Sequence, residues 1–157
     1  MARNARFILS FFVLIFSGLT HGQTEPVVVT ATRTAQTVDA LLAPVSVIDR
    51  EEIEALQPVT VSDILRTVPG VSVSNTGGLG QPSAVFLRGA EFDHVLVLID
   101  GVKVGSATLG STAFQFLDPD QIERIEVVRG PRSSLYGPDA IGGVIQIFTR
   151  DPDKAPR

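Results

Sequence analysis

The sequence predicts a small α+β domain, in which a mixed β-sheet is combined with short helices. About five apolar strands and three short helices follow one another in mixed order rather than as repeated βαβ units. Of the 157 residues, the 135 that follow a predicted signal peptide suit one small domain with one modest core. The chain has no cysteine, so packing must hold the domain together without disulfides or a thiolate metal site.

Residues 1–22 have the pattern of a secretory signal peptide. A positively charged start, "MARNAR", precedes the apolar run "FILSFFVLIFS" and the small and polar "GLTHGQ". The run is shorter than the ~20 residues that a membrane-spanning helix needs. We expect cleavage after Gly22, with Thr20 as the alternative site, and therefore an exported protein. A buried core helix is the competing interpretation.

An extended segment with no clear partner follows in residues 23–43. The stretch "EPVVVTATR" is β-branched at nearly every central position, which favours an extended backbone. The segment comprises Val27, Val28, Val29, Thr30, Ala31 and Thr32. No turn residue follows it closely, and residues 34–43 have no periodicity, so they are interpreted as a linker.

The next elements have clear start and stop signals. "PVSVID" alternates apolar and polar residues and predicts a short strand. Asp49 is expected to cap a helix that ends before Pro58. A second short helix is predicted to begin at Thr60, with Asp63 three residues on, and to end at the Pro-Gly of residues 69–70.

The remaining strands alternate with loops rich in small residues. Strands are predicted for "VSVS", "AVFLRG" and "HVLVLIDG", and the last of these is apolar enough to be central. Loops are predicted for residues 75–83 and 102–114. Asp118 is expected to cap a helical turn that leads into a strand at residues 125–128. "PRSSLYGPDAIGG" predicts a turn or short helix, and "VIQIFT" a final strand.

Composition excludes several classes of function. The net charge is −4, and it becomes more negative without Arg3 and Arg6, which argues against a nucleic-acid partner. His94 is the only histidine outside the predicted signal peptide, so neither a Ser-His-Asp triad nor a zinc site can be assembled. "GGLG" and "AIGG" match no phosphate-binding loop, and "DPDQ" lacks the spacing of a calcium loop. We therefore expect no enzyme activity, no catalytic residue, no metal and no cofactor.

Several motifs in one order carry a family resemblance. They are "VVVTATR", "TVSDILRTVPGV", "FLRG", "HVLVLIDGV", "IERIEVVRGPRSSLYGPDAIGGVIQI" and the closing "TR". Through them residues 26–150 resemble the plug domain of TonB-dependent outer-membrane receptors, and most of all the plug of cobalamin (vitamin B12) receptors. The resemblance implies that residues 44–150 form a plug that gates a pore in the cell outer membrane.

The resemblance also gives the extended segment a partner. It implies that residues 27–32 are the TonB box, exposed to the periplasm and bound by the inner-membrane protein TonB. An extended, β-branched segment can add itself to a sheet edge through main-chain hydrogen bonds. Pro26 would stop pairing upstream, and residues 34–43 would act as a tether. An ordinary edge strand of the domain is the alternative.

Ligand and barrel contacts are implied in the same way. The residues of the two predicted loops that would touch a small-molecule ligand are Asn75, Thr76, Leu79, Gln81, Ser83, Ser106, Thr108 and Ser111. Such neutral polar loops suit cobalamin better than an anionic ferric siderophore, and flexible loops without a ligand are the alternative. Arg88 and Arg129 match family arginines that pair with acids on the inner wall of the barrel.

The family pattern continues beyond this sequence. Receptors of this kind have a barrel of about 22 strands after the plug, and residues 151–157 match the start of the linker to it. We expect a truncated receptor, a fragment or a lone plug. The leading hypothesis is the plug module of a receptor for active cobalamin uptake. The alternatives are a soluble periplasmic plug that binds TonB without transport, and the plug of a ferric-siderophore receptor.

Overall fold

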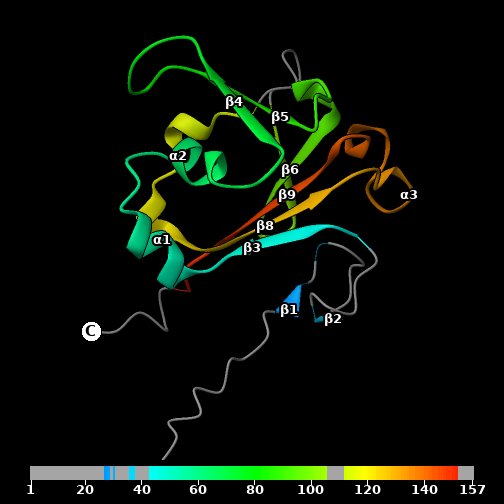
Figure 1. Ribbon diagram of the computed structural model, residues 1–157, viewed down its shortest axis with the longest axis horizontal. Helices are drawn as coiled ribbons and strands as arrows, with labels where there is room; N and C mark the ends of the chain where they lie inside the picture. Colours follow the sequence, from blue (N-terminus) through cyan, green and yellow to red (C-terminus); the bar gives the residue numbers. More distant parts are fainter. Residues whose placement is uncertain (1–26, 29, 31–35, 38–42, 106–111, 152–157) are drawn as a thin grey trace, which may run out of the picture.

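The computed structural model describes residues 27–28, 30, 36–37, 43–105 and 112–151 (Figure 1). Nine strands lie in these ranges: β1 (Val27–Val28), β2 (Gln36–Thr37), β3 (Val45–Ile48), β4 (Val71–Asn75), β5 (Ser83–Leu87), β6 (Val95–Ile99), β7 (Val102–Val104), β8 (Ile122–Arg129) and β9 (Gly143–Thr149). The α-helices are α1 (Arg50–Leu56), α2 (Val61–Arg66) and α3 (Ser133–Tyr136). Short 3₁₀ turns are η2 (Phe92–His94), η3 (Phe114–Phe116), η4 (Pro119–Gln121) and η5 (Pro138–Ala140).

A five-stranded mixed sheet organises the domain. Its order is β3-β8-β9-β6-β7, and only the β6–β9 pair is parallel. The pairs β4–β5 and β1–β2 form separate two-stranded sheets. The predicted α+β class is therefore confirmed, and so is the interior position of β6. Residues Val95 to Leu98 of β6 are all buried, as expected of a strand covered on both faces.

One face of the sheet carries the main apolar core. The helices α1 and α2 lie on this side together with β4 and β5 (Figure 1). In α2, Val61, Ile64 and Leu65 are buried and recur at the spacing of one helix face. They pack with sheet residues such as Ile125 and Ile145, both fully buried.

The predicted helix caps are confirmed. The carboxylate of Asp49 accepts a hydrogen bond from Glu52 N at 2.9 Å. Thr60 and Asp63 form a reciprocal capping box at the start of α2. Asp118 accepts from the backbone N–H of residue 120 at 2.9 Å and begins η4. Local sequence signals therefore place these helix and turn starts correctly.

Several predicted boundaries are wrong. Residues 36–37 form β2 and 102–104 form β7, although both lie in segments predicted as linker or loop. β8 begins at Ile122 rather than at residue 125. Asp100 and Gly101 have φ of +48° and +81° and connect β6 to β7 as a tight hairpin. An Asp-Gly pair is a strong hairpin signal, so β7 was predictable from the sequence.

The loop after β4 is also shorter than predicted. Asn75 is the last residue of β4, and Ser83 is the first residue of β5, where it is 5% exposed. The two residues face each other in the antiparallel register. A connecting loop of residues 76–82 remains, because pairing with the neighbouring strand extends both strands into the polar sequence.

No helix among the described residues is long and apolar enough to cross a membrane.

Gly143 gives a stability prediction. It lies between β8 and β6 with φ +152°, and an added Cβ would overlap Val128 O and lie 2.8 Å from Leu87 Cδ1. Gly143→Ala should therefore lower the free energy of unfolding by about 3 kcal/mol. The matched control is Gly78→Ala, whose Cβ would meet nothing within 4 Å and which should change stability by less than about 0.5 kcal/mol. Urea unfolding of both variants checks this, and equal effects would contradict it.

Candidate functional site

The extended N-terminal segment has a partner in the structure. Val27 pairs with Thr37 and Val28 with Gln36 in antiparallel register. Figure 1 places β1 and β2 beside β3 and β8, on the side of the sheet away from α1 and α2. The expected strand without a partner is therefore wrong, because part of the predicted linker supplies β2. Val29, Ala31 and Thr32 lie outside the described residues.

Thr30 is held by side chains of the central sheet. It is 0% exposed, although its segment was expected to be exposed to the periplasm. Its backbone N–H donates to Glu126 Oε2 at 2.9 Å, and its hydroxyl donates to the same oxygen at 2.6 Å. The Tyr136 hydroxyl donates to Thr30 O at 2.9 Å. Both main-chain polar groups of Thr30 are thus satisfied by side chains more than ninety residues away in the sequence.

Glu126 is the centre of this cluster. It is 0% exposed and faces Gln146 across the β8–β9 pair. Arg124 Nε donates to Glu126 Oε1 at 3.0 Å, and its guanidinium lies 3.8 Å from the centre of the Phe148 ring. A buried carboxylate is tolerated only when it is paired and hydrogen-bonded, and Thr30 and Arg124 meet that need. We call Thr30, Arg124, Glu126, Tyr136 and Gln146 the Thr30 cluster.

The sequence analysis did not identify the members of this cluster that lie in the sheet, Arg124, Glu126 and Gln146. One signal was present: "IEVV" in β8 and "VIQIF" in β9 are apolar runs that are each interrupted by one polar residue, Glu126 in one and Gln146 in the other. A polar residue in the middle of an apolar strand needs a partner. What the sequence could not supply was the register that puts the two opposite each other.

Arg88 and Arg129 lie together at the ends of β5 and β8. Both side chains flank Gly70, where an added Cβ would be 3.5 Å from Arg88 Cγ and 3.9 Å from Arg129 Cδ. Arg129 Nη1 donates to Pro69 O at 2.7 Å. Burial, and next the Arg88 charge, lower the pKa of Arg129 below its ordinary value. Neither guanidinium forms an ion pair within the described part of the chain, so this positive pair is suited to an anionic group.

The polar loop 76–82 lies on the opposite side of the domain from β1 and β2 (Figure 1). The Asn75 side chain accepts from Gly77 N at 2.9 Å, and the Thr76 hydroxyl donates to Pro82 O at 3.3 Å. Leu79 is 76% exposed and Gln81 is exposed, so these two are accessible to a ligand. Ser83 is buried in β5, and Ser106, Thr108 and Ser111 lie outside the described residues.

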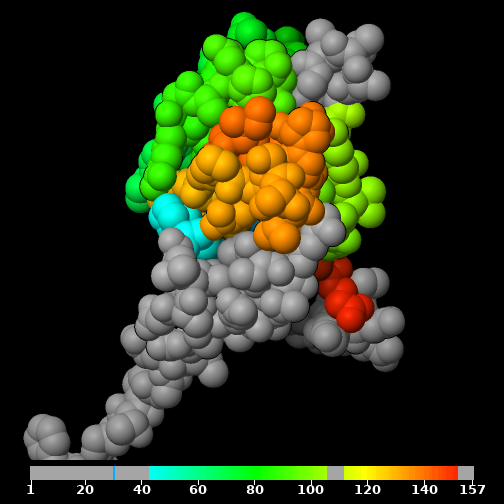
Figure 2. All heavy atoms as spheres, turned by 90° about the vertical axis from the view of Figure 1, so that its right-hand side faces the viewer, coloured from blue at the N-terminus to red at the C-terminus, as the bar shows by residue number. Residues whose placement is uncertain are grey.

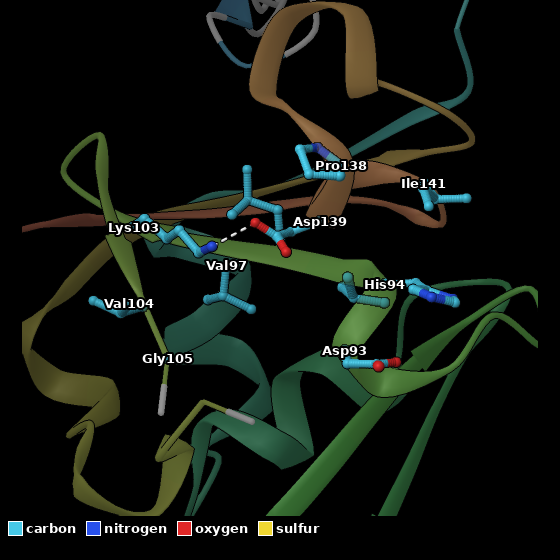
Figure 3. Close-up of a pocket in the computed structure, with 11 residues that line it drawn as sticks. Asp93, His94, Val97, Lys103, Val104, Gly105, Pro138, Asp139 and Ile141 are labelled. Atoms are coloured by element: carbon cyan, nitrogen blue, oxygen red, sulfur yellow. Dashed lines mark hydrogen bonds and ion pairs between the residues drawn. The ribbon is translucent and has the colours of Figure 1, made fainter. Parts of the chain in front are cut away.

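A cleft of about 610 Å³ lies beside β6 and β7. Figure 3 shows His94 and Asp93 towards the same end of it as Ile141, and Lys103 with Val104 towards the other end. Lys103 and Asp139 form an ion pair of 2.5 Å across it. The described lining residues include no serine or cysteine beside His94.

The comparisons with known proteins agree with this architecture. Residues 37–144 match the family model described as TonB-dependent Receptor Plug Domain. Over 125 residues the chain is 53% identical to "Vitamin B12 transporter BtuB" of Vibrio vulnificus and 50% identical to the protein of the same name from Photobacterium profundum. Each alignment covers 80% of this chain and 20% of the relative. The chain thus spans about a fifth of the length of these curated relatives.

Solved structures show the same fold. The siderophore receptor PirA from Pseudomonas aeruginosa is 36% identical, with a TM-score of 0.54 over 69% of this chain and 18% of PirA. FpvAI, in a complex with pyocin S2, has a TM-score of 0.68 over 80% of this chain and 17% of FpvAI. At 23% identity this second likeness concerns the fold alone.

Replacing Arg129 and replacing Arg88 should change the free energy of unfolding differently. Arg129→Met should lower the free energy of unfolding by about 1–2 kcal/mol, because Pro69 O loses a charged hydrogen-bond donor. Arg88→Met should leave stability unchanged or raise it slightly, because it removes a like charge beside Arg129. Chemical denaturation of both variants is the measurement. Equal destabilisation by both would show that the two guanidiniums do not repel each other.

Proposed function

Since this chain belongs to the TonB-dependent receptor plug domain family, we propose that it is the plug module of an outer-membrane receptor for active uptake. The observation that carries the proposal is the two-sided arrangement of the domain. The extended segment lies against one side of the central sheet, and the accessible polar loop lies on the other. A plug of this kind faces a ligand on one side and an energy-coupling partner on the other.

Cobalamin is the proposed substrate. Support comes from the relatives named vitamin B12 transporters, at 53% and 50% identity over four fifths of this chain. The accessible loop side chains, Leu79 and Gln81 among them, are uncharged. They suit a large neutral ligand with many amide groups. The plug of a siderophore receptor is the second candidate, because PirA is 36% identical over 69% of the chain.

TonB is the proposed partner of residues 27–32. β1 already has a strand conformation and pairs in antiparallel register, so the segment can present main-chain donors and acceptors to a sheet edge. Residues 1–22 would serve as the signal peptide, 23–43 as the TonB box and tether, and 44–150 as the plug. The proposed role is non-catalytic, and a lone periplasmic plug that occupies TonB is the alternative.

Arg88 and Arg129 are the proposed contacts to a barrel wall in the outer membrane. Their positive pair has no acidic partner within the described part of the chain. Carboxylates on a surrounding wall would relieve the repulsion between the two guanidiniums. Partial burial there would strengthen the ion pairs and make the loss of one partner costly.

Strand addition to TonB is tested by Val28→Pro. Proline removes a main-chain donor and restricts φ, so the variant should lose capture by the C-terminal domain of TonB while the domain stays folded. The control is Thr24→Pro, which places the same ring upstream of Pro26 and should leave capture unchanged. Undiminished capture of Val28→Pro would overturn residues 27–32 as the TonB box.

Ligand binding by this chain alone should be weak. The proposed ligand contacts of the plug are only part of a site, and binding must order loop 76–82 at roughly 0.5–1.5 kcal/mol per immobilised side chain. Isothermal calorimetry should therefore detect no cobalamin affinity tighter than about 1 μM, or about −8 kcal/mol. Grafting loop 76–82 onto a related full receptor should recover tight binding. Submicromolar binding by the chain alone would contradict an incomplete site.

A further inference from the structure

We propose that Glu126 and Tyr136 act as a latch: they hold Thr30 of the proposed TonB box (residues 27–32, the coupling segment) against the domain and thereby set the affinity for TonB. This inference rests on the proposed function of residues 27–32. Glu126 in β8 and Tyr136 in α3 both lie outside the coupling segment, and in this proposal they control when that segment is accessible. Both are positioning residues, since they act through Thr30.

The latch and TonB compete for the same main-chain groups of Thr30. Strand addition uses the backbone N–H and C=O of the added segment. In the structure the N–H of Thr30 donates a hydrogen bond to Glu126 Oε2, and the C=O of Thr30 accepts one from the Tyr136 hydroxyl. The N–H is a single donor and cannot serve a sheet edge on TonB while its contact lasts, and the C=O is already occupied at one of its two lone pairs. The closed segment and the TonB-bound segment are therefore mutually exclusive at this residue.

Thr30 and the carboxylate that holds it are both buried. Thr30 and Glu126 are both 0% exposed, so a partner protein cannot reach Thr30 without first displacing it from the sheet. Displacement takes two donors away from a buried carboxylate, which favours the closed state. Arg124 Nε remains on Glu126 Oε1, so the carboxylate keeps a charged donor when the segment leaves. Opening is thus unfavourable but reversible.

Tyr136 holds Thr30 from a loop of the domain, outside the central sheet. It is the last residue of α3, in the loop of residues 130–142 that Figure 2 shows in orange at the centre of one face. The same loop continues through η5 into the cleft beside Lys103. The hydroxyl of Tyr136 therefore ties Thr30 to this loop, and the Tyr136 side chain packs against the smaller apolar cluster of Leu96, Leu98, Ala140 and Val144.

If Thr30 is held in most molecules, the apparent affinity of the chain for TonB is lower than its intrinsic affinity. The apparent dissociation constant is the intrinsic one divided by the open fraction. A variant that weakens the latch raises this fraction, and it should raise TonB affinity by the same factor while the closed state still dominates. The exchange rate of the Thr30 amide reports the same open fraction without any partner.

The experiment measures both quantities on the full chain for Tyr136→Phe and Glu126→Gln. Each substitution keeps the size of the side chain and removes a hydroxyl or a charge. Tyr136→Phe should speed Thr30 amide exchange roughly three- to tenfold, and Glu126→Gln roughly tenfold or more. Affinity for the C-terminal domain of TonB, measured by calorimetry, should increase by matching factors. Circular dichroism melts verify that each variant is folded.

Two matched controls separate the latch from general loosening. Ser134→Ala removes a hydroxyl from an exposed position of the same helix α3. Glu123→Gln neutralises an exposed carboxylate of the same strand β8, which pairs with Arg150 at 4.0 Å. Neither side chain contacts Thr30 in the structure. Both controls should leave Thr30 exchange and TonB affinity unchanged.

Three results would overturn the latch. One is unchanged Thr30 exchange in both test variants. Another is faster exchange with unchanged or weaker TonB binding, because the contacts would then not limit access to the segment. The third is an equal response of the controls. If the wild-type chain and every variant fail to bind TonB, the proposed function fails and its control by the latch fails with it. If TonB binds all of them equally, only the latch fails.

Discussion

A fully buried carboxylate in the middle of β8 governs the arrangement of this domain. Glu126 has no exposed surface, and the strand register places it opposite Gln146 on the sheet face away from α1 and α2. A charge at such a position must be paired and hydrogen-bonded or it destabilises the fold. Thr30 and Arg124 provide these bonds, so the N-terminal segment is drawn onto the sheet by the electrostatic requirement of a residue 96 positions away.

The two faces of the sheet consequently have different roles. The face under α1 and α2 is apolar and supplies most of the core, with fully buried residues such as Ile64, Ile125 and Ile145. The opposite face combines a smaller apolar cluster around Leu96 and Val144 with the polar Thr30 cluster. Apolar packing is non-directional, whereas the hydrogen bonds to Thr30 are directional. The apolar core and the polar Thr30 cluster thus lie on different sides of one sheet.

Sequence reasoning was most reliable where local signals determine structure. Asp49, Thr60 and Asp118 begin the helical elements that their positions predict, because a cap bonds to main-chain groups two or three residues away. The apolar run of β6 predicts an interior strand for a similarly direct reason. The failures are short strands such as β2, which have little periodicity of their own and exist only because a neighbour pairs with them.

The sequence by itself determined the α+β class, the caps, the interior strand and, through its motifs, the family. It also predicted the extended backbone found at Val27–Val28, from β-branching that acts within each residue. Only the tertiary structure decided that Val27 and Val28 pair with β2, that Thr30 is buried, and that Glu126 and Tyr136 hold it. The physical reason is the distance along the chain over which each kind of interaction acts. Propensity and capping act over a few residues, whereas the register of β8 on β9 depends on packing across the whole sheet. That register, together with the α3 connection between the two strands, brings a carboxylate and a hydroxyl to one residue near the N-terminus.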